Sequence, residues 1–236
     1  MMSLIVVPVQ LITLQIAQTL QIVYKEAMIT LAIDTSSTKT AIALLEERDE
    51  KLKLLDESSW KSKNNEAENL LPGIQKLLKK NKKTFKDIKN AIVIKGPGSF
   101  TGLRIGVATA NVISYLNSAH LYCLNAFDYY WKMLSARPQN TALVLYAGSG
   151  GVYVNGELVN LPDLKKTLAD KNIKEIFGNI SKDQKKEVKH LKFKKLRKSF
   201  GKVLEKFDLK DLEKTQIVEP LYIKGPGITP NKKCYT

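Results

Sequence analysis

The fold of this chain is decided by the stretch Lys95-Gly-Pro-Gly-Ser-Phe-Thr-Gly-Leu-Arg-Ile-Gly106. Gly96 and Gly98 can adopt positive φ angles, and the ring of the proline between them fixes its φ near the value of a turn. A hydroxyl side chain, Ser99 or Thr101, then stands where it can cap a helix by accepting a hydrogen bond from a free backbone N–H. The stretch therefore predicts a strand, a tight loop and a helix in succession.

The helix predicted after this loop carries small residues at steps of four. Gly102, Gly106 and Ala110 share one of its faces because residues four apart lie above one another. An interior glycine costs a helix about 1 kcal/mol relative to alanine. Two glycines on one stripe indicate that another backbone comes unusually close, so we interpret this face as one made for contact.

Outward from this stretch, the hydrophobic pattern predicts an α/β protein in which two blocks of strands are each followed by helices. In the first block we expect strands at 29–34, 40–45, 51–55, 91–94 and around 121, with helices at 66–80, 101–116 and 126–134. In the second we expect strands at 141–145, 152–159 and 174–177, with helices at 162–169 and 194–207. Asn155-Gly156 favours a hairpin turn within the second of these strands.

The two blocks define two lobes, residues 28–125 and residues 126–236. Residues 1–27 precede them, and Leu4 to Tyr24 carries no charge and is rich in Leu, Ile and Val. Met28 directly precedes a strand and is a candidate start of translation, which would make residues 1–27 an untranslated or disordered extension. An amphipathic docking segment and a membrane anchor are the alternatives; we favour a protein without a membrane association.

Composition limits the class of protein and its partners. The 236 residues are enough for one large domain or two small lobes, and the net charge is +15. Residues 163–214 hold 17 Lys and Arg against 9 Asp and Glu, a balance of +8 that favours an acidic partner such as nucleic acid. Only four of the 38 basic residues are Arg, which makes a solvated lysine surface the alternative. Two cysteines are too few for a disulfide framework and fit a cytoplasmic protein.

Two segments are candidates for binding phosphate. Asp34-Thr-Ser36 follows the first strand, where a carboxylate and hydroxyls suit a metal–phosphate ligand or simply close a tight turn. The glycine loop lacks a Walker Lys-Ser/Thr and the dinucleotide spacing, but its N–H groups can still hold an anion. We treat these positions as a remnant of a phosphate loop: Asp34, Thr35, Ser36, Gly96, Gly98 and Ser99.

Catalysis by this chain alone has little support. His120 and His190 lie far apart and belong to no metal-binding pair, and no Ser or Cys stands in a nucleophile elbow. We therefore expect no catalytic residue, no metal site and no cofactor bound by the chain alone.

Several motifs together resemble the TsaB (YeaZ) family of tRNA threonylcarbamoyladenosine biosynthesis proteins. They are Leu31-Ala-Ile-Asp-Thr-Ser36, Glu68-Asn-Leu-Leu-Pro72, Gly96 to Gly106, and Glu219-Pro-Leu-Tyr-Ile-Lys224. The resemblance spans residues 28–224 in the family's order. It implies the ASKHA fold of actin-like ATPases and sugar kinases, with a degenerate second lobe.

The resemblance also implies a function and partners. TsaB-like proteins form a heterodimer with their paralogue TsaD, which transfers a threonylcarbamoyl group to N6 of adenosine 37 in tRNAs that read codons beginning with A. TsaE, an ATPase, joins transiently, so ATP and Mg²⁺ are expected only in the complex. Whether the chain forms a homodimer without TsaD is left open by the sequence. A stand-alone ASKHA ATPase or kinase and a basic tRNA-binding module are the alternative functions.

On this resemblance, two helices are expected to dock on TsaD, through the apolar stripe of 66–80 and the glycine face of 101–116. The expected interface residues are Glu68, Leu70, Leu71, Ile74, Leu78, Gly102, Arg104, Gly106 and Ala110. The alternative is that both faces pack within this chain. Two segments depart from the family pattern: Glu66-Ala-Glu68 has lost a histidine, and 146–153 has lost charged groups, so a site in the second lobe is not expected.

Overall fold

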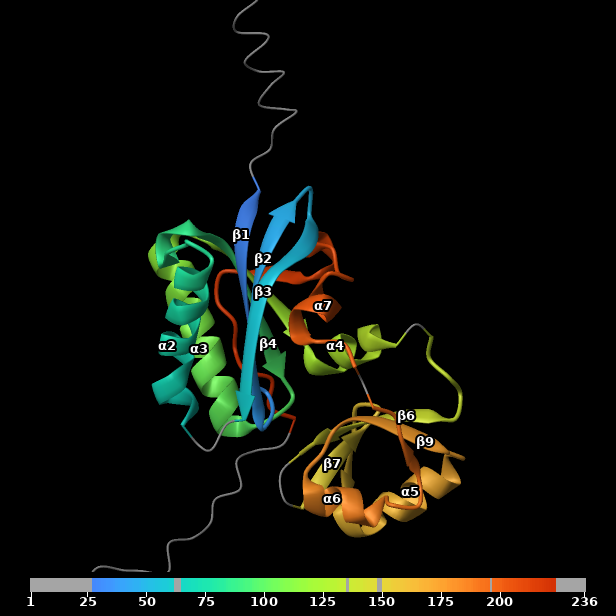
Figure 1. The fold of residues 1–236 in the computed structure, drawn as a ribbon. Coiled ribbons are helices and arrows are strands. Elements are labelled where there is room, and N and C mark those ends of the chain that lie inside the picture. Colours follow the sequence, from blue (N-terminus) through green and yellow to red (C-terminus); the bar gives the residue numbers. More distant parts are fainter. Residues whose placement is uncertain (1–26, 62–64, 135, 148–149, 196, 224–236) are drawn as a thin grey trace, which may run out of the picture.

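The computed structural model describes residues 27–61, 65–134, 136–147, 150–195 and 197–223. Its strands form two sheets, one in each lobe (Figure 1). The first sheet has the order β11-β5-β4-β1-β2-β3, and the second has the order β10-β9-β6-β7-β8. The predicted α/β class with two lobes is therefore confirmed.

The first sheet consists of β1 (Met28–Asp34), β2 (Lys39–Arg48), β3 (Lys51–Lys61), β4 (Ile88–Gly96), β5 (His120–Asn125) and β11 (Glu213–Thr215). The second consists of β6 (Thr141–Tyr146), β7 (Gly151–Val154), β8 (Glu157–Asn160), β9 (Glu175–Asn179) and β10 (Lys192–Phe193). The helices are α2 (Glu66–Lys80), α3 (Phe100–Asn117), α4 (Ala126–Met133), α5 (Leu164–Asp170), α6 (Lys182–Glu187) and α7 (Phe200–Leu204). Short 3-10 turns lie at Phe85–Asp87, Leu161–Asp163 and Leu209–Asp211.

The two sheets repeat one topology. In the first, β1 pairs antiparallel with β2 and parallel with β4, and β2 continues into β3. In the second, β6 takes the place of β1: it pairs antiparallel with β7 and parallel with β9, and β7 continues into β8. The second lobe keeps this topology with shorter strands, so the chain is an internal duplication of one α/β unit.

Helices cover both faces of the first sheet, which explains why its central strands are apolar throughout. α2 and α3 lie over one face and α4 and α7 over the other (Figure 1). Leu31, Ile33 and Ile42 point into the core beneath α2 and α3. Ala32 and Ala43 point to the opposite face, into a second core. This core continues through α4 to Leu143 and Phe177 of the second sheet. The second core therefore joins the two lobes.

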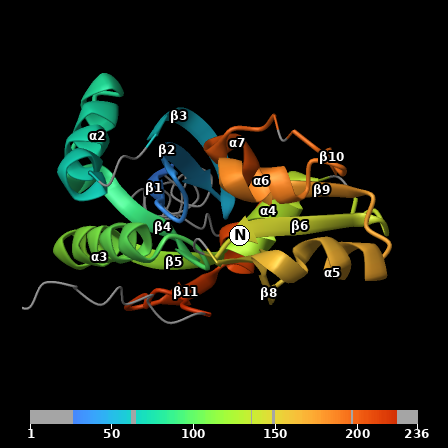
Figure 2. The same ribbon diagram turned by 90° about the horizontal axis from the view of Figure 1, so that it is seen from below.

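The chain returns to the first lobe after it has built the second sheet. Phe200 and Val203 of α7 are buried, and α7 packs on β2 and β3. β11 then pairs antiparallel with β5, as Figure 2 shows. The second sheet is thus inserted between parts of the chain that belong to the first.

Most predicted elements occur at the predicted places, and the helix at 66–80 has the predicted bounds. The helix predicted at 194–207 is wrong: helix forms only over Phe200–Leu204, after β10. Gly201 lets this helix approach β3 closely, because a Cβ there would collide with the Leu54 side chain. The sequence pattern also missed α6 and β11.

Within the described ranges, no helix is both long and apolar enough to cross a membrane. The extension predicted over residues 1–27 lies, apart from Ala27, outside them.

Candidate functional site

A tight turn follows β1, and its centre is the buried side chain of Asp34. The Asp34 Oδ1 atom accepts hydrogen bonds from the Ser36 backbone N–H at 2.9 Å and from the Ser36 hydroxyl at 2.6 Å. Burial raises the pKa of the Asp34 carboxyl above its ordinary value, although both hydrogen bonds from Ser36 act in the opposite direction. The turn therefore holds a carboxylate in a poorly solvated place.

The glycine loop closes directly on this turn. Ser99 donates its backbone N–H to the Ser36 carbonyl at 2.7 Å, and its hydroxyl caps α3 by accepting from the Gly102 N–H. A Cβ at Gly98 would overlap the Ser36 carbonyl, so only glycine fits there. The residues predicted to form a phosphate loop thus come together, and three of them, Asp34, Ser36 and Ser99, are joined by hydrogen bonds.

The small-residue face of α3 packs against the same turn. A Cβ at Gly102 would overlap the Thr35 carbonyl oxygen, and one at Gly106 would overlap the Thr35 hydroxyl. Ala110 is fully buried in the core under α3. The backbone that comes close to this face is therefore that of β1 and its turn. The expectation that these three residues contact a partner is corrected: they pack within the chain, because the face points at its own sheet.

The space left at this turn is small. A cavity of about 10 Å³ lies between the lobes, lined by Ser36, Ser37, Pro97, Tyr130, Leu145, Tyr146 and Asn179. Burial raises the pKa of the Tyr130 hydroxyl, and the nearby Asp34 carboxylate raises it further. One water molecule needs about this volume. A nucleotide would need the lobes to move apart.

The end of the described chain locks the glycine loop from the other side. Leu221 donates its backbone N–H to the Lys95 carbonyl at 2.7 Å, and a Cβ at Gly96 would lie 2.7 Å from the Leu221 carbonyl oxygen. The Tyr222 ring lies 4.5 Å from that of Phe100, and its hydroxyl accepts from Arg104 Nε at 3.2 Å. Arg104, predicted at the interface, is exposed and held by its own chain.

The predicted interface residues of α2 divide between its two faces. Leu70, Ile74 and Leu78 are almost completely buried in the core against the sheet, so they are corrected from interface to core. Glu68 and Leu71 are exposed, and half of the Leu71 surface reaches solvent. A partner on α2 would meet these two and not the apolar stripe.

The α3 face turned away from the sheet is apolar and exposed. Val112, Tyr115 and Leu116 expose 55%, 86% and 73% of their surfaces, and Ala108 is exposed one turn earlier. These four residues, spaced by three and four, form what we call the outer α3 stripe. This stripe was not predicted from the sequence, although its residues follow the same helical spacing as the glycine face.

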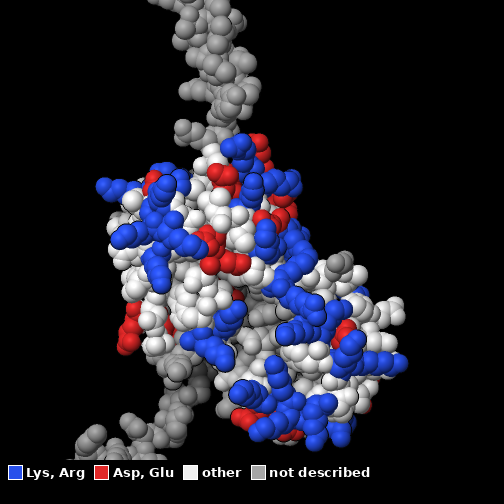
Figure 3. Space-filling view, viewed as in Figure 1, with Lys and Arg blue, Asp and Glu red and all other residues white. Residues whose placement is uncertain are grey.

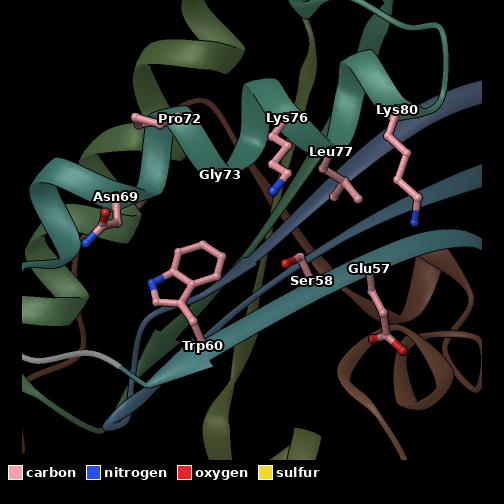
Figure 4. Close-up of a pocket in the computed structure, with 9 residues that line it drawn as sticks. All are labelled: Glu57, Ser58, Trp60, Asn69, Pro72, Gly73, Lys76, Leu77 and Lys80. Atoms are coloured by element: carbon pink, nitrogen blue, oxygen red, sulfur yellow. The ribbon is translucent and has the colours of Figure 1, made fainter.

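A groove separates α2 from β3 (Figure 4). Its volume is about 580 Å³, in the range of ligand pockets. Its lining residues are Glu57, Ser58, Trp60, Asn69, Pro72, Gly73, Lys76, Leu77 and Lys80. The Trp60 ring rises from the strand toward the helix, and the Lys76 side chain descends from the helix into the space above Ser58 (Figure 4).

Lysines and arginines cover much of the face seen in Figure 3. One group of them is crowded: Lys206 Nζ donates to the Lys132 carbonyl at 2.8 Å, and neighbouring Lys198 followed by burial lowers the pKa of Lys206 to about 8. The Lys132 ammonium lies 4.8 Å from the centre of the Phe207 ring, beside a cavity of about 450 Å³. In the described ranges, no three His, Cys, Asp or Glu side chains form a group that could hold a metal ion.

The duplicated topology, with a carboxylate turn after β1 and a loop before α3, defines a protein of the ASKHA class. One solved structure shares this fold over most of the chain: a Pseudomonas aeruginosa protein described as uncharacterized with similarity to peptidase YeaZ. It has a TM-score of 0.58 and 16% identity, and the match covers 84% of this chain and all of that one.

The family model for TsaD, tRNA N6-adenosine threonylcarbamoyltransferase, matches residues 60–214, more than half of the chain. The chain therefore belongs to the TsaD-like family, and the curated proteins that it resembles are named TsaB.

One of these relatives, from Buchnera aphidicola (subsp. Baizongia pistaciae), is 40% identical over 96 residues, which are 40% of this chain and 41% of the relative. The Bacillus subtilis protein is 36% identical over 88 residues, 37% of each. Both are named tRNA threonylcarbamoyladenosine biosynthesis protein TsaB. The matches thus span about two fifths of the length of these relatives.

Proposed function

We propose that this chain takes part in threonylcarbamoyladenosine (t6A) biosynthesis as an accessory subunit that binds and activates TsaD. The observation that carries the proposal is the outer α3 stripe. Three large apolar side chains, Val112, Tyr115 and Leu116, stand together on one exposed helix face. A contiguous apolar patch on a soluble domain marks an interaction site. Leu71 of the neighbouring α2 is exposed as well, and we assign it to TsaD as a separate contact.

The turn at Asp34 supports a subunit that is not itself the catalyst. Asp34 and Ser36 of this turn are hydrogen-bonded to each other, and the cavity beside the turn holds about 10 Å³. The stand-alone ATPase or kinase, which needs room for a nucleotide at this turn, is therefore the less favoured function. Magnesium-dependent ATP turnover by the purified chain would reinstate it.

The test is coexpression with the TsaD of the same organism, followed by size exclusion and an assay of tRNA modification with and without this chain. We expect a heterodimer, and modification that falls at least tenfold when the chain is omitted. Leu116→Glu should abolish copurification because it places a charge in the apolar contact. Leu158→Glu is the matched control, since Leu158 is 43% exposed on β8 of the other lobe. Equal yields of TsaD with both variants would show that the outer α3 stripe is not the interface.

A second candidate function, contact with tRNA, is favoured by the crowded lysines 132, 198 and 206. Lys198 and Lys132 both disfavour the ammonium form of Lys206, and a phosphate bound beside them would relieve that repulsion. Lys198→Ala should lower the dependence of tRNA binding on salt by about one phosphate contact. Lys186→Ala, which removes a lysine already paired with Asp183, should not. Identical salt slopes for the two variants would remove this candidate.

Transient binding of TsaE and a homodimer in the absence of TsaD belong to the same proposal. The coexpression experiment tests both when TsaE is added or TsaD is left out.

A further inference from the structure

We propose that the groove between α2 and β3 binds an extended acidic segment of a partner protein, which adds as a strand to the outer edge of β3. This inference goes beyond the proposed function: it concerns the side of α2 that faces β3, and it does not depend on the outer α3 stripe.

The first observation is an open strand edge. β3 is the last strand of its sheet, and the residues that the structure describes cover only the beginning of its outer edge. Lys51 forms a bridge with Asp208, and Glu205 Oε1 accepts the Leu54 backbone N–H at 2.9 Å. From Ser58 to the end of β3, no described residue pairs with that edge. Unpaired edges are templates on which a further strand can form main-chain hydrogen bonds.

The second observation is the length and lining of the groove. Its helical wall runs from Asn69 to Lys80, which is roughly 16 Å at 1.5 Å per residue. That length fits about five residues of extended chain. Trp60, Pro72 and Leu77 make the lining largely apolar. A Cβ at Gly73 would lie 2.8 Å from the Trp60 ring, so the glycine lets the indole reach under the helix. An apolar side chain of the incoming segment would pack against that ring.

The third observation is charge. Lys80 is paired with Asp56 at 2.7 Å, and Glu57 Oε2 accepts the Gly201 backbone N–H at 2.9 Å. Lys76 points into the groove and forms no ion pair with any described residue (Figure 4). Glu57 points away from α2, whereas Lys76 and Lys80 point from α2 toward β3 (Figure 4), so the charges that face the groove are those of lysines, which favours an acidic segment over a basic one.

The experiment uses the full chain with Trp131→Phe, which leaves Trp60 as the only tryptophan. The probe is the synthetic peptide acetyl-Asp-Val-Glu-Phe-Glu-Val-Asp-amide, and binding is followed by the fluorescence of Trp60. We expect a saturable shift, and binding at least tenfold weaker when lysines replace the acidic residues of the peptide. Lys76→Glu should weaken binding of the acidic peptide at least tenfold, whereas Lys83→Glu, a lysine outside the groove lining, should change it less than twofold.

Strand addition has a signature that needs no variant of the protein. Only alternate amides of an added strand face β3, so two peptides are compared, each N-methylated at one of the two sets of alternate amides. Methylation of the set that faces β3 should abolish binding, and methylation of the other set should not. An equal response to the two methylated peptides would overturn strand addition. No saturable shift, or equal binding of the acidic and lysine peptides, would overturn the proposal as a whole. Both results are independent of whether TsaD copurifies with the chain.

Discussion

Asn111 in the middle of α3 and Val218 near the end of the described chain exchange two hydrogen bonds. The Asn111 Nδ2 atom donates to the Val218 carbonyl, and the Val218 backbone N–H donates to Asn111 Oδ1, both at 2.9 Å. Val218 itself is buried in the core under α3. The Asn111 side chain thus pairs with the N–H and the carbonyl of Val218, as a neighbouring strand would. This pairing holds the segment in the position where Leu221 contacts the glycine loop.

Replacing Asn111 by alanine should release this segment. Two buried backbone groups of Val218 would lose their partners, at about 1 kcal/mol for each hydrogen bond. We expect a loss of about 2 kcal/mol in the free energy of urea unfolding, and faster amide hydrogen exchange over residues 216–221. Asn117→Ala, which removes a single bond to Ile113 within α3, should leave the exchange of residues 216–221 unchanged.

Gly98→Ala tests the closure of the glycine loop on the Asp34 turn. The new Cβ would overlap the Ser36 carbonyl, so the loop must move and the Ser99–Ser36 bond must lengthen. Overpacking of this kind costs about 1 to 3 kcal/mol, measured by urea unfolding. Gly150→Ala is the control, because a Cβ there has no neighbour within 4 Å. A difference below about 0.5 kcal/mol between the two variants would contradict the close approach.

Gly106→Leu should damage folding first. If Gly106 lay in an interface with a partner, this substitution would cost partner binding more than folding. In the structure the leucine would collide with Thr35, so we expect the isolated chain to lose about 3 kcal/mol, the upper end of the usual cost of overpacking. Thermal unfolding of the chain without TsaD measures this directly. A variant as stable as the native chain would return Gly106 to the list of interface candidates.

Asp34→Asn should stabilise the chain at neutral pH. Because the pKa of Asp34 is raised in the folded state, the folded chain binds the Asp34 proton more tightly than the unfolded chain does. Stability is therefore lost as pH rises from the ordinary value of 3.8 through the folded pKa, and asparagine avoids that loss. The gain in the free energy of unfolding of Asp34→Asn over the native chain should be constant above the folded pKa of Asp34 and should vanish as pH falls toward 3.8.

The control for this titration has the opposite sign. Hydrogen bonds from Thr84 lower the pKa of Asp87, so its contribution to stability is present above 3.8 and lost as pH falls through the folded pKa. Asp87→Asn should therefore destabilise the chain at pH 7 and have no effect in acid. Urea midpoints of both variants between pH 3 and pH 8 compare the two directly.

Local sequence patterns predicted most of the helices and strands. The alternation and apolar runs of 29–34 and 91–94 predicted buried strands, and the stripe of 66–80 predicted a helix with the observed ends. The pattern failed where tertiary contacts decide. β11 has three residues and forms by pairing with the edge of β5. α7 is limited to the segment that packs on β2 and β3. No local rule specifies either contact.

The candidate site shows the same division. The sequence predicted that the glycines of 96–106 admit a close neighbour, which the structure confirms, but spacing does not say whose backbone it is. Thr35 and Ser36 occupy the place assigned to a partner or a phosphate. The outer α3 stripe could have been predicted from the sequence. A helix that is buried on one face only has a polar opposite face, whereas α3 has apolar residues there too, at 108, 112, 115 and 116.

The return of the chain to its first sheet sets an order for folding during synthesis. The strands of the second sheet, from β6 to β10, are contiguous and can pair as soon as they leave the ribosome. The first lobe has to wait: Phe200, Val203, Leu204 and Phe207 complete its core, and Val218 covers the other face. Until those residues emerge, β2 and β5 expose apolar surface that only the last part of the chain can cover. The lobe made first is therefore finished last, and a chain cut short before residue 200 leaves it incomplete.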